Sequence, residues 1–302
     1  MAAQSLKNAY SLQGLRELLS AYGALWLALE IADYFANKSL VILWLRGHGY
    51  WFVLAGVVFA IFRCVPPLKI AHKLRERDVL ITLAIGDVLS FRGAVVIGSN
   101  TTFDVSERVI SPRSIQGQFT SKYYAAESQL EAEIEAQLRD LHCEELVGPR
   151  SGKCKRYPIG SVVQLRPKDG TRVKIGYLLA ISDINEFGNA EGKFEGLKQA
   201  LGELWVYIGK KGEKDQILMP VLGTGFSRLT QSREIVVQEI IQSFVAACAE
   251  KTFCENLTIV MNDGDVFEKR IDFAALGDYL KHVCLYTQFS YRSGEKIGTP
   301  EN

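Results

Sequence analysis

The hydrophobic positions of this chain follow two different patterns, one before residue 66 and one after residue 78. In the first part, residues 18–36 and 50–65 are almost continuously apolar, and a further apolar block lies at 40–45. In the second part, short apolar runs alternate with segments in which apolar residues recur every three or four positions. Short runs predict buried strands and the longer spacing predicts amphipathic helices, so the two parts should fold differently.

The second part predicts an α/β domain. Strands are expected at 79–85, 94–98, 159–165, 173–181, 217–222 and 257–261, and helices at 127–143, 192–208, beyond residue 228 and at 271–283. Most of these strands are apolar along their whole length, which predicts a three-layer α/β/α sandwich around a mixed sheet. Ligands of such sheets bind at the carboxyl ends of the strands, where turns at Gly86, Gly98 and Gly223 would lie.

The long apolar runs predict a two-helix transmembrane hairpin over residues 18–66, because a helix needs about 20 apolar residues to cross a bilayer. The first crossing ends either near Ala36 or near Leu45, since Asn37 and Lys38 interrupt the run. Basic residues precede the hairpin and are dense after it, which places both ends in the cytoplasm. We therefore expect a multi-pass protein of the cell inner membrane with a cytoplasmic soluble domain.

The predicted hairpin divides the chain into segments. They are a cytoplasmic N-terminus at 1–17, the hairpin at 18–66, a basic connector at 67–77, a ligand-binding domain at 78–285 and a polar tail at 286–302. Pro66 and Pro67 end the second crossing. The connector, LKIAHKLRER, is expected to be helical and to lie near anionic headgroups.

Two carboxylates interrupt the first predicted crossing. Glu30 and Asp33 are three residues apart and share one helix face. A carboxylate at the centre of a bilayer costs about 2.5–3.5 kcal/mol on insertion scales, so both should face protein or water. They form either a polar seam for helix association or a pore, or a pair near the membrane interface if the helix is shifted.

Composition excludes several classes of function. The formal net charge is +1, from 35 basic and 34 acidic residues, which does not suggest nucleic-acid binding. The six cysteines are scattered without a CxxC pair or a partnered histidine, so we expect buried thiols in a reducing compartment. Neither they nor the four histidines show metal-ligand spacing, and no metal or cofactor is expected.

The segment from Gly223 to Ser227 carries the clearest candidate chemistry. An apolar strand pattern ends there in Gly223, Thr224, Gly225, Phe226 and Ser227, and a long helical pattern follows. Backbone N–H groups at a helix start attract anions, and the two glycines let a ligand approach closely. The segment is either a phosphate cradle or a plain strand-to-helix turn without a ligand.

Two further turns add to this candidate site. Asp87 follows the first strand of the domain and can accept a hydrogen bond from an exocyclic amine such as that of adenine. Asn100 follows the second strand and can bind a ribose hydroxyl. With the cradle for a pyrophosphate, these pieces together specify ADP-ribose.

In this order the pieces resemble a macro domain over about residues 78–283. The family carries a Gly-Asp-Ile turn for adenine, an Asn after the second strand for the distal ribose and a Gly-Thr-Gly-aromatic loop for the phosphates. The resemblance implies ligand contacts at Asp87 and Val88, at Asn100 and at the 223–227 loop, with Phe226 packing on a ribose.

The chain departs from the family's hydrolases at one wall of the expected site. Their Asn-Ala-Ala-Asn run and three glycines are replaced by GSNT at 98–101 and by the longer VSERVISPRSIQGQF. Only Gly117 remains of the flexible wall, with Gln116 beside it. A catalytic water would be poorly placed, so we expect a ligand sensor; a membrane-bound ADP-ribosyl hydrolase is the alternative.

A macro domain behind a membrane hairpin is similar to the membrane-anchored effectors of type II Thoeris antiphage defence. This resemblance implies a TIR-domain partner that consumes NAD and makes an ADP-ribose-derived signal, histidine-ADP-ribose. It also implies that binding drives assembly of a homo-oligomer and membrane damage.

Overall fold

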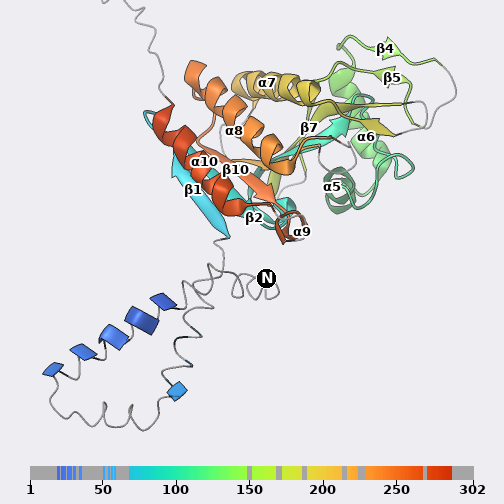
Figure 1. The fold of residues 1–302 in the computed structure, drawn as a ribbon. Helices are drawn as coiled ribbons and strands as arrows, with labels where there is room; N and C mark the ends of the chain where they lie inside the picture. The colour runs from blue at the N-terminus through green and yellow to red at the C-terminus, as the bar shows by residue number, and fades with distance from the viewer. Residues whose placement is uncertain are drawn as a thin grey trace, which may run out of the picture. The chain divides into compact units, whose positions relative to one another are not determined.

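The computed structural model divides into two compact units, Met1–Leu68 and Lys69–Asn302. Within the second unit it describes residues 69–147, 152–167, 172–185, 189–212, 216–223, 229–267 and 271–287. Within the first it describes Leu68 and scattered helical positions between 19 and 58. Figure 1 shows the chain coloured along its sequence.

The second unit is built on a mixed sheet of eight strands. They are β1 (Lys69–Lys73), β2 (Leu80–Ile85), β3 (Gly93–Asn100), β6 (Val162–Leu165), β7 (Val173–Ile184), β8 (Ala190–Glu191), β9 (Gln216–Pro220) and β10 (Asn256–Met261). The order across the sheet is β1-β2-β10-β9-β3-β7-β6, and β8 pairs with β7. Strands β2, β10, β9, β3 and β7 are parallel, whereas β1, β6 and β8 pair antiparallel. The predicted mixed sheet is confirmed.

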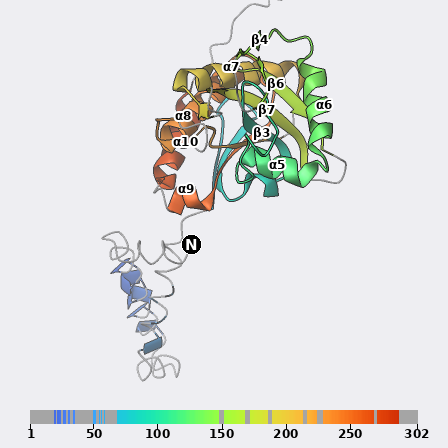
Figure 2. The same cartoon turned by 90° about the vertical axis from the view of Figure 1, so that its right-hand side faces the viewer.

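Helices cover both faces of this sheet (Figure 2). One layer holds α7 (Phe194–Lys211), α8 (Arg233–Glu250) and α10 (Phe273–Tyr286), and the other holds α5 (Ile115–Tyr123) and α6 (Glu127–Leu138). Side chains of β3 alternate between the two layers: Ala94 and Val96 join the first core, and Val95 and Ile97 the second. The predicted three-layer sandwich is therefore confirmed.

The long helices follow the predicted apolar spacing. Leu197, Leu201 and Leu204 of α7 are buried, as are Val237, Ile241 and Phe244 of α8. Ser232 caps α8, because its hydroxyl accepts a hydrogen bond from the N–H of Ile235 at 3.4 Å. The spacing of apolar residues thus predicted these helices correctly. The ends of α7 and α10 differ from the predicted ends by two or three residues.

The prediction of a helical connector was wrong. Residues Lys69–Lys73 form β1, an edge strand paired with β2. Alternate residues Ile70 and His72 are half-buried, and Ile70 packs close to Gly277 of α10, while Lys69 and Lys73 stay exposed. The alternation has period two, and exposed lysines are common on edge strands. The compact unit therefore begins at Lys69 and not at residue 78.

The acidic helix is shorter than its sequence pattern predicted. The helix α6 ends at Leu138, and Leu141, expected on its inner stripe, is 40% exposed. A short hairpin follows instead, formed by β4 (Glu144–Glu145) and β5 (Lys155–Arg156). The helix α5 and two short helices, η1 (Val88–Ser90) and α9 (Asp263–Phe267), were not predicted from the sequence.

The predicted transmembrane hairpin falls mostly outside the described residues. Those that are described between 19 and 58 are helical, and a Cβ built on Gly56 would lie 2.6 Å from the ring of Tyr22. Glu30 is exposed, whereas Asp33 lies outside the described residues. Among the residues that the structure describes, no helix combines the length and the apolar character needed to cross a bilayer. The hairpin and the polar seam stay predictions.

All the cysteines were expected to be buried, but only some of those that the structure describes are. Cys248, Cys254 and Cys284 are buried free thiols, but Cys154 is exposed. Cys64 and the tail beyond residue 287 lie outside the described residues.

Candidate functional site

A cavity of about 760 Å³ lies at the carboxyl ends of the parallel strands. It is lined by Gly86 after β2, by Gly98 to Asn100 at the end of β3, and by Gly223 after β9. The three predicted glycines do line one cavity at the sheet edge, but Gly98 lies within β3, which continues to Asn100, and not in a turn. The cavity has the size of a typical small-molecule site, about 300–1,000 Å³.

The β9 turn provides part of the cavity floor through Gly223. Its φ of +71° lies in the left-handed region that favours glycine, and a Cβ at this position would collide with Leu229. The N–H of Leu229 donates to the carbonyl of Gly223 at 3.2 Å, which closes the turn. Residues Thr224 to Ser227, the rest of the predicted cradle, lie outside the described residues.

The long helix was expected to begin at the glycine turn, and this prediction was wrong. It begins at Arg233, and its cap Ser232 already takes the N–H of Ile235. A capping serine specifies the start of a helix, whereas a glycine turn leaves it open.

Asp87 lies on the cavity rim and also caps a helix. One carboxylate oxygen accepts a hydrogen bond from the N–H of Leu89 at 2.9 Å, at the start of η1. Asp87 is exposed, and both Asp87 and the buried Val88 line the cavity. The side chain is thus a turn former, and its placement also suits recognition of a ligand.

Asn100 is fixed at the end of β3 by its own side chain. It is 5% exposed, and its Oδ1 accepts hydrogen bonds from the N–H groups of Thr102 and Asp104, each at 3.2 Å. The Thr102 hydroxyl oxygen lies 3.0 Å from the same oxygen. Backbone N–H groups can only donate, so the atom facing them must be the amide oxygen. This orientation leaves the amide nitrogen as a donor toward the cavity, which Asn100 lines.

Gln116 and Gly117 lie in the first turn of α5. Gln116 lines the cavity and is 4% exposed. Gly117 does not line it and instead borders an adjoining groove of about 540 Å³. The Gly117 N–H donates to the hydroxyl of the cap Ser114 at 3.0 Å, and a Cβ here would collide with the Ser111 carbonyl. Its role is to let α5 begin close to the preceding loop.

An ion pair that the sequence did not predict also lines the cavity. Arg233 Nε donates to Asp265 Oδ1 at 2.8 Å, and Asn262 Nδ2 donates to Asp265 Oδ2 at 2.7 Å. All three residues line the cavity. The only local signal is the Asn-x-x-Asp spacing after β10, and nothing in the sequence links it to Arg233.

The loop that replaces the family's glycine run carries charges into the site. Glu107, Arg108 and Arg113 line the cavity and are exposed. The described residues contain no group of three or more acidic, histidine or cysteine side chains placed to hold a metal ion. The expectation of no metal and no cofactor stays a prediction.

Residues 81–262 match the family model described as "Thoeris protein ThsA, Macro domain". The matched stretch is more than half of the 302 residues. The chain belongs to the ThsA macro domain family. The match begins at residue 81, so the predicted hairpin lies outside it.

A relative of this ThsA-family chain is the Thoeris protein ThsA of Bacillus amyloliquefaciens (strain Y2). The two are 26% identical over 197 residues, which span 62% of this chain and 62% of that protein. The chain is thus similar to less than two thirds of the relative's length.

Solved macrodomains are also similar to the ThsA-family chain. An Oceanobacillus iheyensis macrodomain with ADP is 10% identical, with a TM-score of 0.46 and coverage of 71% of this chain and 94% of that one. A Trypanosoma brucei macrodomain in complex with ADP-ribose is 11% identical, with a TM-score of 0.44 and coverage of 69% and 72%.

Proposed function

We propose that this ThsA-family domain binds an ADP-ribose-type nucleotide in the cavity at the strand ends. The observation that carries the proposal is that Gly86–Asp87, Asn100 and Gly223 line a single cavity of suitable size. These are the positions at which the sequence predicts recognition of adenine, ribose and phosphate.

Each of the three proposed contacts with the nucleotide has a chemical basis. One oxygen of Asp87 caps η1, and the carboxylate has a second oxygen that can accept from the adenine amino group. The Asn100 amide nitrogen donates to a hydroxyl of the distal ribose. The turn at Gly223 and the amides of the 224–227 loop hold the phosphates.

We further propose that the domain binds its ligand without turning it over. A hydrolase needs a general base within reach of the attacking water. Among the described carboxylates that line the cavity, Asp87 caps a helix and Asp265 pairs with Arg233. Glu107 is the third such carboxylate, and it is exposed on the loop that replaces the glycine run.

The proposed role is that of a membrane-anchored effector in antiphage defence. The ligand would be a histidine-ADP-ribose signal made by a TIR-domain protein, and binding would drive assembly and membrane disruption. Large apolar side chains in the first unit support the anchor, since Trp26, Tyr34 and Phe35 are more than half exposed. Only a ligand that binds the assembled state more tightly can drive this change.

Calorimetry of the 302-residue chain tests the binding site. We expect heat of binding with ADP-ribose and histidine-ADP-ribose, and a loss of affinity in Asp87→Asn. Asparagine is as good a cap as aspartate, so η1 should persist while one acceptor becomes a donor. The matched control is Asp272→Asn, which makes the same change at the cap of α10, outside the cavity. No binding, or unchanged affinity in Asp87→Asn, refutes the assignment.

Turnover is tested separately with ADP-ribosylated protein and with the free nucleotides. We expect no product release by the wild-type chain. Release that disappears in Glu107→Gln would instead establish the hydrolase.

Anchoring and assembly are tested with the full chain in liposomes that contain a fluorescent dye. Dye release that depends on histidine-ADP-ribose is expected, and Asp87→Asn should abolish it. A chain that fails to float with liposomes refutes the anchor.

A further inference from the structure

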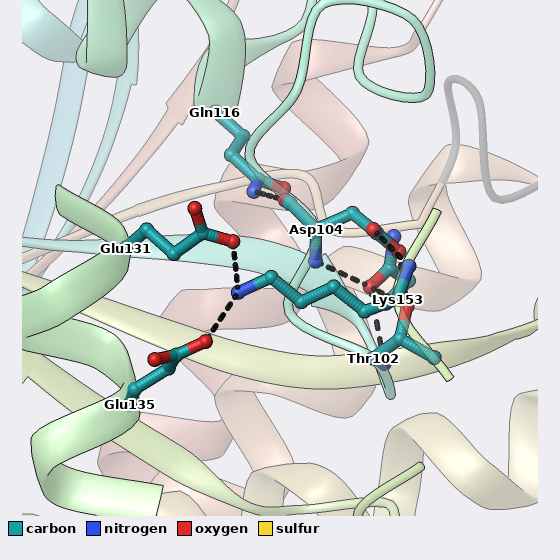
Figure 3. A network of polar contacts seen from close by, with 7 residues as sticks. Thr102, Asp104, Gln116, Glu131, Glu135 and Lys153 are labelled. Carbon is teal, nitrogen blue, oxygen red and sulfur yellow. Dashed lines mark hydrogen bonds and ion pairs between the residues drawn. The ribbon is translucent and has the colours of Figure 1, made fainter. Parts of the chain in front are cut away.

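We propose that Asp104, which lies outside the cavity, is a positioning residue for the ligand. It sets the hydrogen-bonding atoms that the distal end of the cavity presents. This inference rests on the proposed binding function. We call Asn100, Thr102, Asp104, Gln116 and Lys153 the Asp104 network, and Figure 3 labels the last four of these residues.

The backbone of Asp104 contacts both cavity-lining amides. Its N–H donates to Asn100 Oδ1 at 3.2 Å, and its carbonyl accepts from Gln116 Nε2 at 2.7 Å. Asp104 is 2% exposed and does not line the cavity, whereas Asn100 and Gln116 do. One buried residue therefore joins the end of β3 to the start of α5.

The carboxylate of Asp104 holds that backbone in place. One oxygen accepts from the Thr102 hydroxyl, and the other accepts from the N–H of Lys153 at 2.8 Å. The Lys153 side chain runs on to α6, where its Nζ pairs with Glu131 at 3.0 Å and Glu135 at 4.0 Å (Figure 3). Both carboxylate oxygens are thus used, and segments far apart in the sequence meet at one side chain.

Gly152 shows how closely the chain surrounds this carboxylate. Its φ is +103°, and a Cβ built on it would lie 2.7 Å from Asp104 Oδ1. A side chain at this position would push on the carboxylate from outside the cavity, because Gly152 does not line it.

The network decides which amide atoms meet the ligand. Backbone N–H groups occupy the oxygen of Asn100, so its nitrogen remains as a donor. One N–H of Gln116 donates to the Asp104 carbonyl, which fixes the orientation of the amide and leaves its oxygen as an acceptor. A neighbouring donor and acceptor suit hydroxyl groups, which both donate and accept, and do not suit a phosphate, which only accepts. The geometry points to a polyhydroxyl group, such as the distal ribose, at this end of the cavity.

Affinities for ADP-ribose and ADP, measured by calorimetry on the full chain, test this role, since ADP lacks the distal ribose. In Asp104→Ala we expect affinity for ADP-ribose to fall about tenfold or more, the effect of one or two lost hydrogen bonds, while affinity for ADP is kept. Asp104→Asn should retain most of the preference, because an amide can accept from Lys153 N–H and donate to the Thr102 hydroxyl.

Two further variants control for folding and for charge. Gly152→Ala should reproduce the selective loss from outside the cavity, and it decides the question if Asp104→Ala does not fold. Glu131→Gln removes a charge that pairs with the Lys153 side chain and leaves the contacts of Asp104 in place, so its preference for ADP-ribose should match the wild type.

The outcomes separate this inference from the proposed function. The positioning role alone is overturned if Asp104→Ala or Gly152→Ala loses affinity for ADP and ADP-ribose equally. It is also overturned if neither variant loses affinity for ADP-ribose. A wild-type chain that binds neither nucleotide overturns the proposed function and this inference together.

Discussion

An alanine at Gly176 should destabilise the second unit through one buried ring. Gly176 lies in β7, and a Cβ built on it would be 2.6 Å from Cζ of Phe119 and 3.1 and 3.2 Å from two further ring carbons. Carbon atoms in contact lie about 3.5–4.0 Å apart, so the ring would have to retreat by about 1 Å. Phe119 is fully buried in α5, which leaves it little room.

The residues around the Phe119 ring determine how much stability Gly176→Ala loses. Phe119 lies 5.0 Å from Tyr123 and 6.1 Å from Tyr124, measured between ring centroids, so its movement displaces α5. Overpacking of this kind costs about 1–3 kcal/mol of unfolding free energy. For a domain of this size we expect the melting temperature to fall by about 2–12 °C.

Thermal and urea unfolding of Gly176→Ala measure this cost. The matched control is Gly202→Ala, because Gly202 lies exposed in α7 with no atom within 4 Å of a built Cβ. Alanine there should stabilise the chain by about 1 kcal/mol, through helix propensity alone. The two glycine substitutions should therefore have opposite signs.

A double-mutant cycle identifies the ring as the cause. Phe119→Leu removes ring atoms, so Gly176→Ala should cost less in that background than in the wild type. Equal costs in both backgrounds, or a Gly176→Ala variant as stable as the wild type, would refute the assignment to Phe119.

Four other positions give further predictions. Gly98→Val should weaken ADP-ribose binding in calorimetry, because even its Cβ would lie 2.6 Å from Ile181 Cδ1 on the cavity floor. Asp272→Ala should cost about 1 kcal/mol in urea unfolding, since it removes the cap of α10. Burial raises the pKa of the Cys248 thiol from 9.0 to about 12, so stability from the protonated thiol is present below pH 9 and lost as pH rises toward 12. The free energy of unfolding, measured between pH 8 and 11, should therefore decline less in Cys248→Ala than in the wild type. The exposed Cys154 should react with a thiol reagent at pH 8 before the buried Cys248, Cys254 and Cys284 do.

The sequence was sufficient for the layers of the domain, because long helices and buried strands have strong periodic patterns. The burial of Leu197, Leu201 and Leu204 at helical spacing illustrates this for α7. The convergence of Gly86, Gly98 and Gly223 at one cavity was also predictable, because parallel strands end at a common edge.

Short and half-exposed elements were not predictable in the same way. The strand β1 is five residues long with a mixed basic and apolar composition, and its pairing with β2 is a tertiary contact. A basic run after an apolar block therefore favoured a membrane-surface helix over an edge strand. The ion pair between Arg233 and Asp265 joins residues 32 apart, and no local pattern predicts it.

The departure from the family's glycine run has a structural consequence that the sequence alone did not supply. In the segment that departs from that glycine run, this chain begins α5 with a capping serine at Ser114 and holds Gln116 against the carbonyl of Asp104. A wall fixed by a cap and a buried carboxylate can present chosen donors and acceptors, because its amides cannot rotate freely. Such a wall favours selective recognition of a ligand, and for that reason we expect selectivity between nucleotides to depend on Asp104.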